Sequence, residues 1–211
     1  MNAKEFLINN FQVNFHTRKP VLTIPNVGRD NLAQWLHALG CETGVEVGVA
    51  KGHYSEVLCK ANPQMKIYGV DAWQPYEGYD DYISVEGLNS MYEASVARMA
   101  PYQNYTIIRA WSSDAVKQFE DNSLDFVYLD ANHADPFISE DIELWNQKIR
   151  PGRILAGHDY VKWIGVDYGV MEAVHSYAGN NNIKPYFVLG SKNSKPGDER
   201  DKYRSWMWIK P

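Results

Sequence analysis

The sequence predicts a doubly wound α/β fold, with seven strands in one mostly parallel sheet and a C-terminal antiparallel hairpin at one end of that sheet. Two observations favour it. Short apolar segments alternate with amphipathic segments long enough to be helices, which is typical of parallel strands joined by right-handed crossovers. The last two apolar segments are joined only by a polar loop, which favours an antiparallel pair.

The elements are expected in the following order. Residues 1–28 contain Pro20 and Pro25 and little apolar pattern, so we expect a segment packed on a single domain that spans residues 1–211. A first helix is expected at about 31–39, capped by Asp30 and ended by Gly40. The strands are expected at 44–48, 66–70, 105–109, 125–129, 153–157, 185–189 and 204–209. The helices between them are expected at about 54–60, 88–99, 114–119, 139–148 and 168–178.

Composition narrows the class of partner. The net charge is −5, and the longest basic run is Arg18-Lys19, so a phosphate backbone would be repelled and a small-molecule partner is favoured over a nucleic acid. The sequence contains no apolar run long enough to span a membrane and no signal-peptide pattern, so we expect a cytoplasmic protein without membrane contact. Cys41 and Cys59 are expected to be reduced thiols. The N-terminal segment and the aromatic C-terminal hairpin could supply a homodimer surface.

The most informative segment is the glycine-spaced turn after the first expected strand. Glu46 lies near the end of this strand, and Gly48 and Gly52 follow it, so the backbone can approach a ligand closely. Asp71 ends the next strand about twenty residues later, where an α/β fold presents an acid to a ribose. A nucleotide-like cofactor is therefore expected. A plain turn and a solvated loop acid are the alternatives. The spacing fits neither a dinucleotide fingerprint nor a phosphate-binding loop.

Two further strand ends carry candidate chemistry. Asp130 and His133 follow the strand at 125–129, whereas His158 and Asp159 follow the strand at 153–157. Parallel strands end at the same edge of a sheet, so these side chains should lie together beside the cofactor. Asp130, His158 and Asp159 are suitable ligands for Mg²⁺ or Mn²⁺. His133 could act as a general base, because imidazole titrates near neutral pH.

The order of these motifs resembles the class I S-adenosylmethionine-dependent methyltransferases, which have a Rossmann-like fold. The resemblance runs over about residues 30–211. It implies that Glu46 orients the ammonium of S-adenosylmethionine, that Gly48 and Gly52 leave room for its amino-acid part, and that Asp71 accepts hydrogen bonds from its ribose hydroxyls. Asp130 borders the same crevice.

The loop at Ser112-Ser113-Asp114 looks like the adenine-side loop of this class. Ser112 and Ser113 could bind the adenine amino edge, with Asp114 as a helix cap, although all three could serve only as a cap. The indoles of Trp73 and Trp111 lie just beyond strand ends, where they could stack on adenine or pack against a helix.

Asp130 and Asp159 also match the metal-dependent small-molecule O-methyltransferases of the catechol and macrolide-sugar types. The sugar-type enzymes have a general-base histidine three residues after the first metal-binding aspartate, where this chain has His133. The chain departs from the pattern at His158, which precedes Asp159 in place of an acidic or Asp-Asn pair. The resemblance implies methyl transfer to a hydroxyl group of a small molecule. A non-catalytic cofactor-binding protein or a different enzyme on the same scaffold is the alternative.

Two segments are candidate walls for the methyl acceptor. Residues 74–90 are long and polar for a strand-to-helix connection and contain tyrosines and acids that could line a pocket: Tyr76, Tyr79, Tyr82, Asp80 and Asp81. The segment could equally be a surface loop. Residues Trp163–Tyr168 form the second candidate wall.

Overall fold

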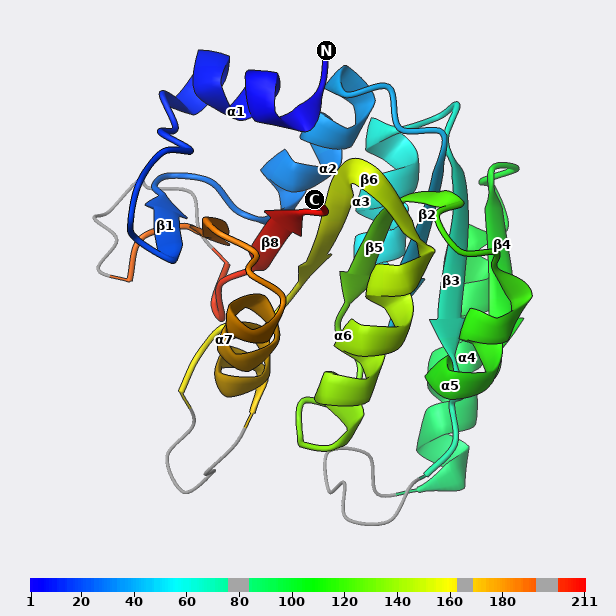
Figure 1. The fold of residues 1–211 in the computed structure, drawn as a ribbon. Helices are drawn as coiled ribbons and strands as arrows, with labels where there is room; N and C mark the ends of the chain where they lie inside the picture. The colour runs from blue at the N-terminus through cyan, green and yellow to red at the C-terminus, as the bar shows by residue number, and fades with distance from the viewer. Residues whose placement is uncertain (76–83, 163–168, 193–200) are drawn as a thin grey trace.

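The computed structural model describes residues 1–75, 84–162, 169–192 and 201–211. Its centre is an eight-stranded sheet with the order β1-β7-β8-β6-β5-β2-β3-β4 (Figure 1). The strands are β1 (Val21–Ile24), β2 (Thr43–Val47), β3 (Lys66–Asp71), β4 (Tyr105–Arg109), β5 (Leu124–Leu129), β6 (Ile149–Gly157), β7 (Tyr186–Leu189) and β8 (Trp206–Ile209). Only β8 runs antiparallel to its neighbours, β6 and β7. The predicted fold class, a mostly parallel sheet with an antiparallel C-terminal pair, is therefore confirmed.

The number of strands and the position of the hairpin differ from the prediction. β1, in the segment expected to lie over the domain, pairs in parallel with β7 and adds an eighth strand. The hairpin of β7 and β8 consequently lies inside the sheet, with β1 at the edge. Proline residues flank the four-residue β1, and only Ile24 within it is buried, so its sequence lacks the apolar run of a central strand.

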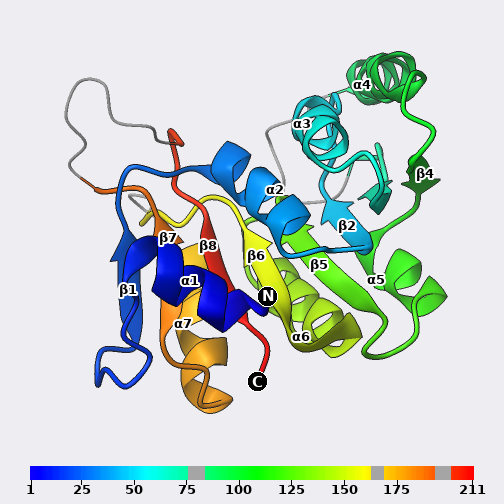
Figure 2. The same cartoon turned by 90° about the horizontal axis from the view of Figure 1, so that it is seen from above.

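Helices cover both faces of the sheet. They are α1 (Ala3–Phe11), α2 (Arg29–Ala38), α3 (His53–Ala61), α4 (Val85–Met99), the short α5 (Ser112–Ala115), α6 (Phe137–Lys148) and α7 (Val170–Asn180). Seen from above, α2, α3 and α4 lie on one side of the sheet and α5, α6 and α7 on the other (Figure 2). The buried residues of α1 belong to the same core cluster as those of α2 and α3. No helix among the described residues is long and apolar enough to cross a membrane.

Three expected helix starts are corrected. The N-cap of α2 is Gly28, not Asp30, and the Asn31 side chain accepts the Gly28 N–H. Ser84 caps α4, which therefore includes residues 85–90 of the expected 74–90 loop. The N-cap of α5 is Trp111, not Asp114.

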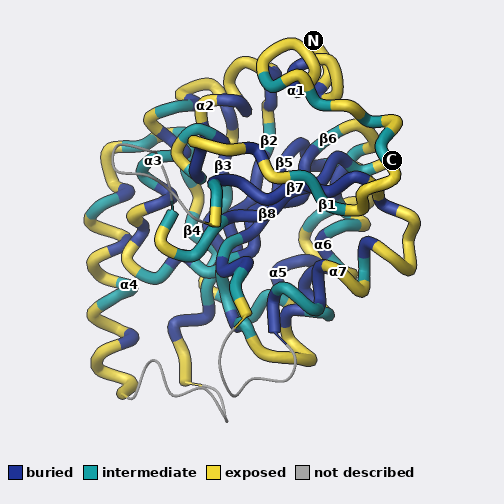
Figure 3. The backbone as a smooth tube through the Cα atoms, turned by 90° about the vertical axis from the view of Figure 1, so that its left-hand side faces the viewer, coloured by how far each residue is buried: buried dark blue, intermediate teal, exposed yellow. Residues whose placement is uncertain are grey.

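Alternation along the strands builds a core on each face of the sheet. All six residues of β5 are buried; Phe126 and Tyr128 join the cluster under α1 to α4, whereas Val127 and Leu129 join the cluster under α5 to α7. The central strands form the buried interior of the molecule (Figure 3). A strand buried on both faces is typically rich in apolar residues, and β5 is apolar apart from the buried Asp125.

The sheet changes direction of growth beside β2. β3 and β4 follow on one side of β2, and β5 and β6 follow on the other. In open α/β sheets, ligands bind outside the carboxyl ends of the strands at this switch point. Residues after β2, β3, β5 and β6 therefore gather around one crevice.

Candidate active site

A cavity of about 630 Å³ opens at this switch point, within the size range of small-molecule sites. Its lining includes most of the side chains singled out from the sequence: Glu46, Gly48, Asp71, Trp73, Trp111, Ser112, Ser113, Asp130 and His133. Gly52 is the N-cap of α3 and is not among the described lining residues. His158 and Asp159 follow β6, and the His158 side chain lies close to that of Asp130. The acceptor-wall candidates at 76–83 and 163–168 lie outside the described residues.

The glycine-spaced turn is shaped by a close backbone approach. Gly48 has φ 92°, and a Cβ at this position would lie 2.1 Å from the carbonyl oxygen of Asp130. Ala50 also adopts a positive φ, of 48°. The missing side chain of Gly48 therefore makes room for the backbone after β5, and it brings the ends of β2 and β5 together beside the cavity.

Asp71 organises the rim of the cavity. Its Oδ2 accepts the backbone N–H groups of Val49 and Ala50 at 3.0 and 2.9 Å, and its Oδ1 accepts the N–H of Trp73 at 2.8 Å. Burial outweighs these hydrogen bonds and raises the pKa of Asp71. A carboxylate has about four lone-pair sites, and three of them are occupied here, so acceptor capacity remains for one ribose hydroxyl.

Trp73 is held in the protein core. It adopts φ 44° and is buried against Leu88, with its ring in a T-shaped contact to Tyr92 at 5.0 Å. Its Nε1 donates to the carbonyl oxygen of Ala50 at 2.8 Å. Trp73 thus borders the cavity in the packing role that the sequence left open.

Glu46 is a fully buried acid at the floor of the cavity. It is 1% exposed, and its carboxyl group accepts a hydrogen bond from the Ser55 hydroxyl on α3. Burial raises the pKa of Glu46 to about 8, against the opposing hydrogen bond from Ser55. The carboxyl group is therefore mostly protonated at pH 7 in the free protein, and a nearby cation would favour its ionised form.

The loop after β4 is tied to helix α6. The Ser112 hydroxyl donates to Asp141, and Trp145 Nε1 donates to Ser112 Oγ at 2.8 Å. Ser113 is exposed, and Asp114 pairs with Lys117 on the surface. The Ser112 proton is thus committed to Asp141 rather than available to a ligand.

Asp141 was missed by the sequence analysis. It lines the cavity, and burial raises its pKa to about 6. A signal was present in the sequence, because Asp141 interrupts the apolar stripe of α6 formed by Ile138, Ile142 and Trp145. An acid on the buried face of a helix indicates either a paired structural group or a ligand contact.

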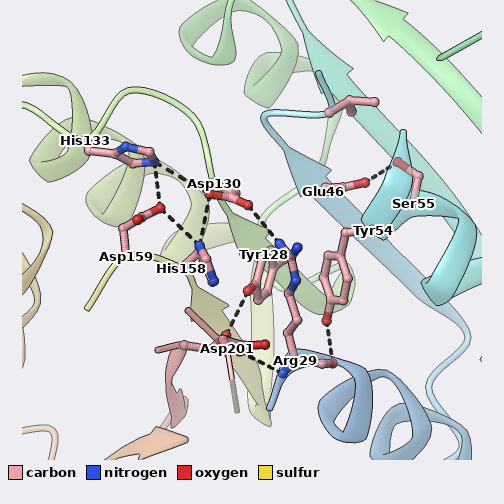
Figure 4. Close-up of polar contacts among 12 residues, drawn as sticks. Arg29, Glu46, Tyr54, Ser55, Tyr128, Asp130, His133, His158, Asp159 and Asp201 are labelled. Carbon is pink, nitrogen blue, oxygen red and sulfur yellow. Dashed lines mark hydrogen bonds and ion pairs between the residues drawn. The ribbon is translucent and has the colours of Figure 1, made fainter. Parts of the chain in front are cut away.

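Two acids and two histidines converge at the ends of β5 and β6 (Figure 4). His133 Nε2 lies 3.5 Å from Asp130 Oδ1 and 3.2 Å from Asp159 Oδ2. His158 Nδ1 lies 3.1 Å from Asp159 Oδ2 and 3.7 Å from Asp130 Oδ1. The structure therefore brings together all four side chains that the sequence placed at these strand ends.

The geometry favours one set of three as possible cation ligands. Donor atoms of Asp130, His133 and Asp159 all lie within 4.8 Å of one another. The sequence predicted His158 as the histidine ligand and His133 as a general base. The geometry instead gives His133 as the histidine of this set. Burial alone would raise the pKa of Asp159, but the hydrogen bond to His158 and the charge of His133 outweigh it and hold this pKa below its usual range.

Arg29 is a second residue that the sequence analysis missed. It begins α2, and its Nη1 lies 3.4 Å from Asp130 Oδ2 at the cavity (Figure 4). A cation in the first turn of a helix opposes the helix dipole. This unfavourable position is the feature of the sequence that could have indicated a functional role for Arg29.

Comparisons with known proteins agree with this architecture. Uncharacterized protein y4gI of Sinorhizobium fredii is 27% identical over 131 residues, which cover 59% of this chain but only 14% of that protein. The chain thus spans about one seventh of the length of this relative.

Two solved structures share the fold at low identity. The O-methyltransferase from Bacillus cereus in complex with SAH is 14% identical, with a TM-score of 0.59, and the alignment covers 98% of this chain and 90% of that one. The O-methyltransferase TomG from Streptomyces achromogenes, involved in tomaymycin synthesis and solved in complex with SAM, is 16% identical, with a TM-score of 0.59 and coverage of 87% and 80%. The family model of the methyltransferase domain matches residues 45–160, more than half of the chain. The chain therefore belongs to the methyltransferase domain family and has the Rossmann-like fold of its class I members.

Proposed function

We propose that this protein transfers the methyl group of S-adenosylmethionine to a hydroxyl group of a small molecule. The observation that carries the proposal is the juxtaposition of two groups of side chains at one cavity. Glu46 and Asp71 present carboxyl groups at the ends of β2 and β3, and the cluster of Asp130, His133 and Asp159 lies beside them after β5 and β6. The first group suits a nucleoside with an amino-acid tail, and the second suits activation of a hydroxyl.

The residues present fit S-adenosylmethionine. The cavity volume is ample for a ligand of this size, and the buried Glu46 has no cationic hydrogen-bond partner among the described residues, so it can receive an ammonium. Asp71 retains acceptor capacity for one of the two ribose hydroxyls. At the loop after β4, we assign the adenine amino group, which is a hydrogen-bond donor, to the carboxylate of Asp141, because this carboxylate has acceptor sites beyond the one that receives the Ser112 hydroxyl.

The residues present also fit a divalent cation. Two carboxylates and one imidazole would hold Mg²⁺ or Mn²⁺, with Asp130, His133 and Asp159 as the ligands. His158 would orient Asp159 from behind, as hydrogen-bond partners of metal-binding side chains generally do. A cation held there would lower the pKa of a hydroxyl bound next to it.

The work of the chain is positioning and proton removal. S-adenosylmethionine supplies an electrophilic methyl group on a sulfonium. Glu46 and Asp71 fix the two ends of the donor, so that the methyl group faces the cluster at the ends of β5 and β6. His133 can take the hydroxyl proton if no cation occupies the cluster, and the adjacent Asp130 and Asp159 would stabilise the resulting imidazolium. The acceptor oxygen then attacks the methyl carbon in line, the bond between this carbon and the sulfur breaks, and S-adenosylhomocysteine leaves as a neutral thioether, a step that the protein assists mainly by orientation.

The test is methyl transfer from S-adenosylmethionine labelled in the methyl group to a panel of sugars, polyols and phenols. The proposal expects a hydroxyl compound to be labelled, a chelator to reduce the rate, and His133→Ala to abolish transfer. His37→Ala is the matched control, because His37 is exposed on α2 away from the cavity. Labelling of amines or thiols but of no hydroxyl compound would contradict O-methylation. An undiminished rate for His133→Ala would remove this residue from the mechanism.

A further inference from the structure

Acidic side chains outnumber permanent cations in the lining of the cavity. Five carboxylic acids line it: Glu46, Asp71, Asp130, Glu140 and Asp141. Among the described lining residues, the permanent cations are Arg29 and Lys51. The Lys51 side chain is exposed, whereas the Arg29 side chain is 31% exposed. Arg29 therefore stands out as the sheltered positive charge of an otherwise acidic site.

Arg29 is fixed from several directions (Figure 4). Its backbone N–H donates to Asp201 Oδ2 at 2.9 Å, and its carbonyl oxygen accepts the Tyr54 hydroxyl at 2.9 Å. Its guanidinium carbon lies 5.0 Å from the centre of the Tyr54 ring, within the range of a cation–π contact. Such anchoring holds the guanidinium at one place on the cavity wall.

The hydrogen-bonding capacity of this guanidinium is mostly unused within the described part of the chain. A guanidinium has five N–H donors. The one side-chain hydrogen bond recorded for Arg29 is the 3.4 Å contact to Asp130 Oδ2, which is long for a charge-assisted bond. An anion entering the cavity would thus meet donors suited to bidentate binding of a carboxylate.

The position of Arg29 along the sheet edge identifies which anion it can meet. The strand order places β5, β2, β3 and β4 side by side. Arg29 contacts Asp130 after β5, and Glu46 belongs to β2, whereas Asp71 ends β3 and Ser112 follows β4. The ribose and adenine positions are therefore on the β3 and β4 side. Arg29 lies at the opposite end, where the amino-acid tail of the donor would lie.

We infer that Arg29 binds the carboxylate of the amino-acid tail of S-adenosylmethionine and so acts as a positioning residue for the donor. The inference rests on the proposed function and extends it. The carboxylate is the only negative group of this donor, and Arg29 with Glu46 would recognise the two opposite charges of the tail. This pairing distinguishes the donor from nucleosides that lack an amino acid.

The experiment compares two ligands that differ only in this carboxylate. S-adenosylhomocysteine and its decarboxylated form, S-adenosyl-3-thiopropylamine, are titrated calorimetrically into the wild type, Arg29→Ala and Arg29→Lys. For S-adenosylhomocysteine, Arg29→Ala should weaken binding about 10- to 100-fold, the range for a lost charge-assisted hydrogen bond. Arg29→Lys should lose less, because it keeps the charge without the fork of donors. Both variants should bind the decarboxylated ligand within about 3-fold of the wild type, well inside the effect of one such bond.

Lys51→Ala is the matched control, since it removes the other lining cation and should leave both affinities unchanged. Equal losses of both ligands in Arg29→Ala, or no loss of either, would overturn the inference while leaving the proposed function intact. A carboxylate-dependent loss in Lys51→Ala rather than in Arg29→Ala would also overturn it. If the wild type binds neither ligand, the proposed function fails, and the inference fails with it.

Discussion

Replacement of Glu46 by glutamine should change how the stability of the protein depends on pH. Glutamine keeps the shape of the side chain and can still accept the Ser55 hydroxyl, but it cannot ionise. In the wild type the pKa of Glu46 is raised by burial from 4.5 to about 8. Between these values the folded protein retains a proton that the unfolded chain has released. The contribution of Glu46 to the free energy of unfolding therefore falls as pH rises from 4.5 to 8 and levels off above 8.

The size of this effect follows from the interval between the two pKa values. Each pH unit is worth about 1.36 kcal/mol, so the interval corresponds to at most ~5 kcal/mol at pH 8 and ~3 kcal/mol at pH 7. Urea unfolding at pH 5, 6, 7 and 8 should show Glu46→Gln gaining stability over the wild type as pH rises. Glu42→Gln, at an exposed acid just before β2, should instead follow the wild type. If the free energies of unfolding of the wild type and Glu46→Gln changed in parallel with pH, Glu46 would not have the raised pKa on which this prediction rests.

Further predictions concern the cavity rim and the donor. Asp71→Asn should weaken S-adenosylhomocysteine binding and lower the free energy of unfolding by ~1–3 kcal/mol, because one of the three backbone N–H groups would face an amide donor. Unchanged titrations and melting curves would contradict this. Gly48→Ala should destabilise far more than Gly152→Ala in urea unfolding, since both have positive φ but only the first would collide with backbone; equal losses would contradict it. Cofactor binding at pH 7 should release close to one proton from Glu46, seen as a binding enthalpy that varies with the buffer.

The alternation of strands and helices was enough to predict the central sheet, because buried parallel strands have strong apolar patterns. β5 is such a strand, and the glycine turn after β2 marks the cavity. β1 was missed because its four residues form a partly exposed edge, and its pairing with β7 depends on distant parts of the chain. The position of the hairpin was wrong for the same reason.

The candidate site followed a similar pattern. Residues at strand ends were predictable, because parallel strands deliver them to one edge. Asp141 and Arg29 reach the cavity from helices, so their contribution depends on how each helix packs and not on motif spacing. The choice between His133 and His158 required distances between side chains, which the sequence does not contain.

Binding of the methyl donor in the cavity at the ends of β2 and β3 underlies every role proposed for the residues around it. Calorimetric titration of S-adenosylhomocysteine into the wild type, with NAD⁺ as the comparison ligand, measures this binding. We expect micromolar binding of S-adenosylhomocysteine at one site per chain and no comparable binding of NAD⁺. Absence of S-adenosylhomocysteine binding, or equal binding of NAD⁺, would contradict it.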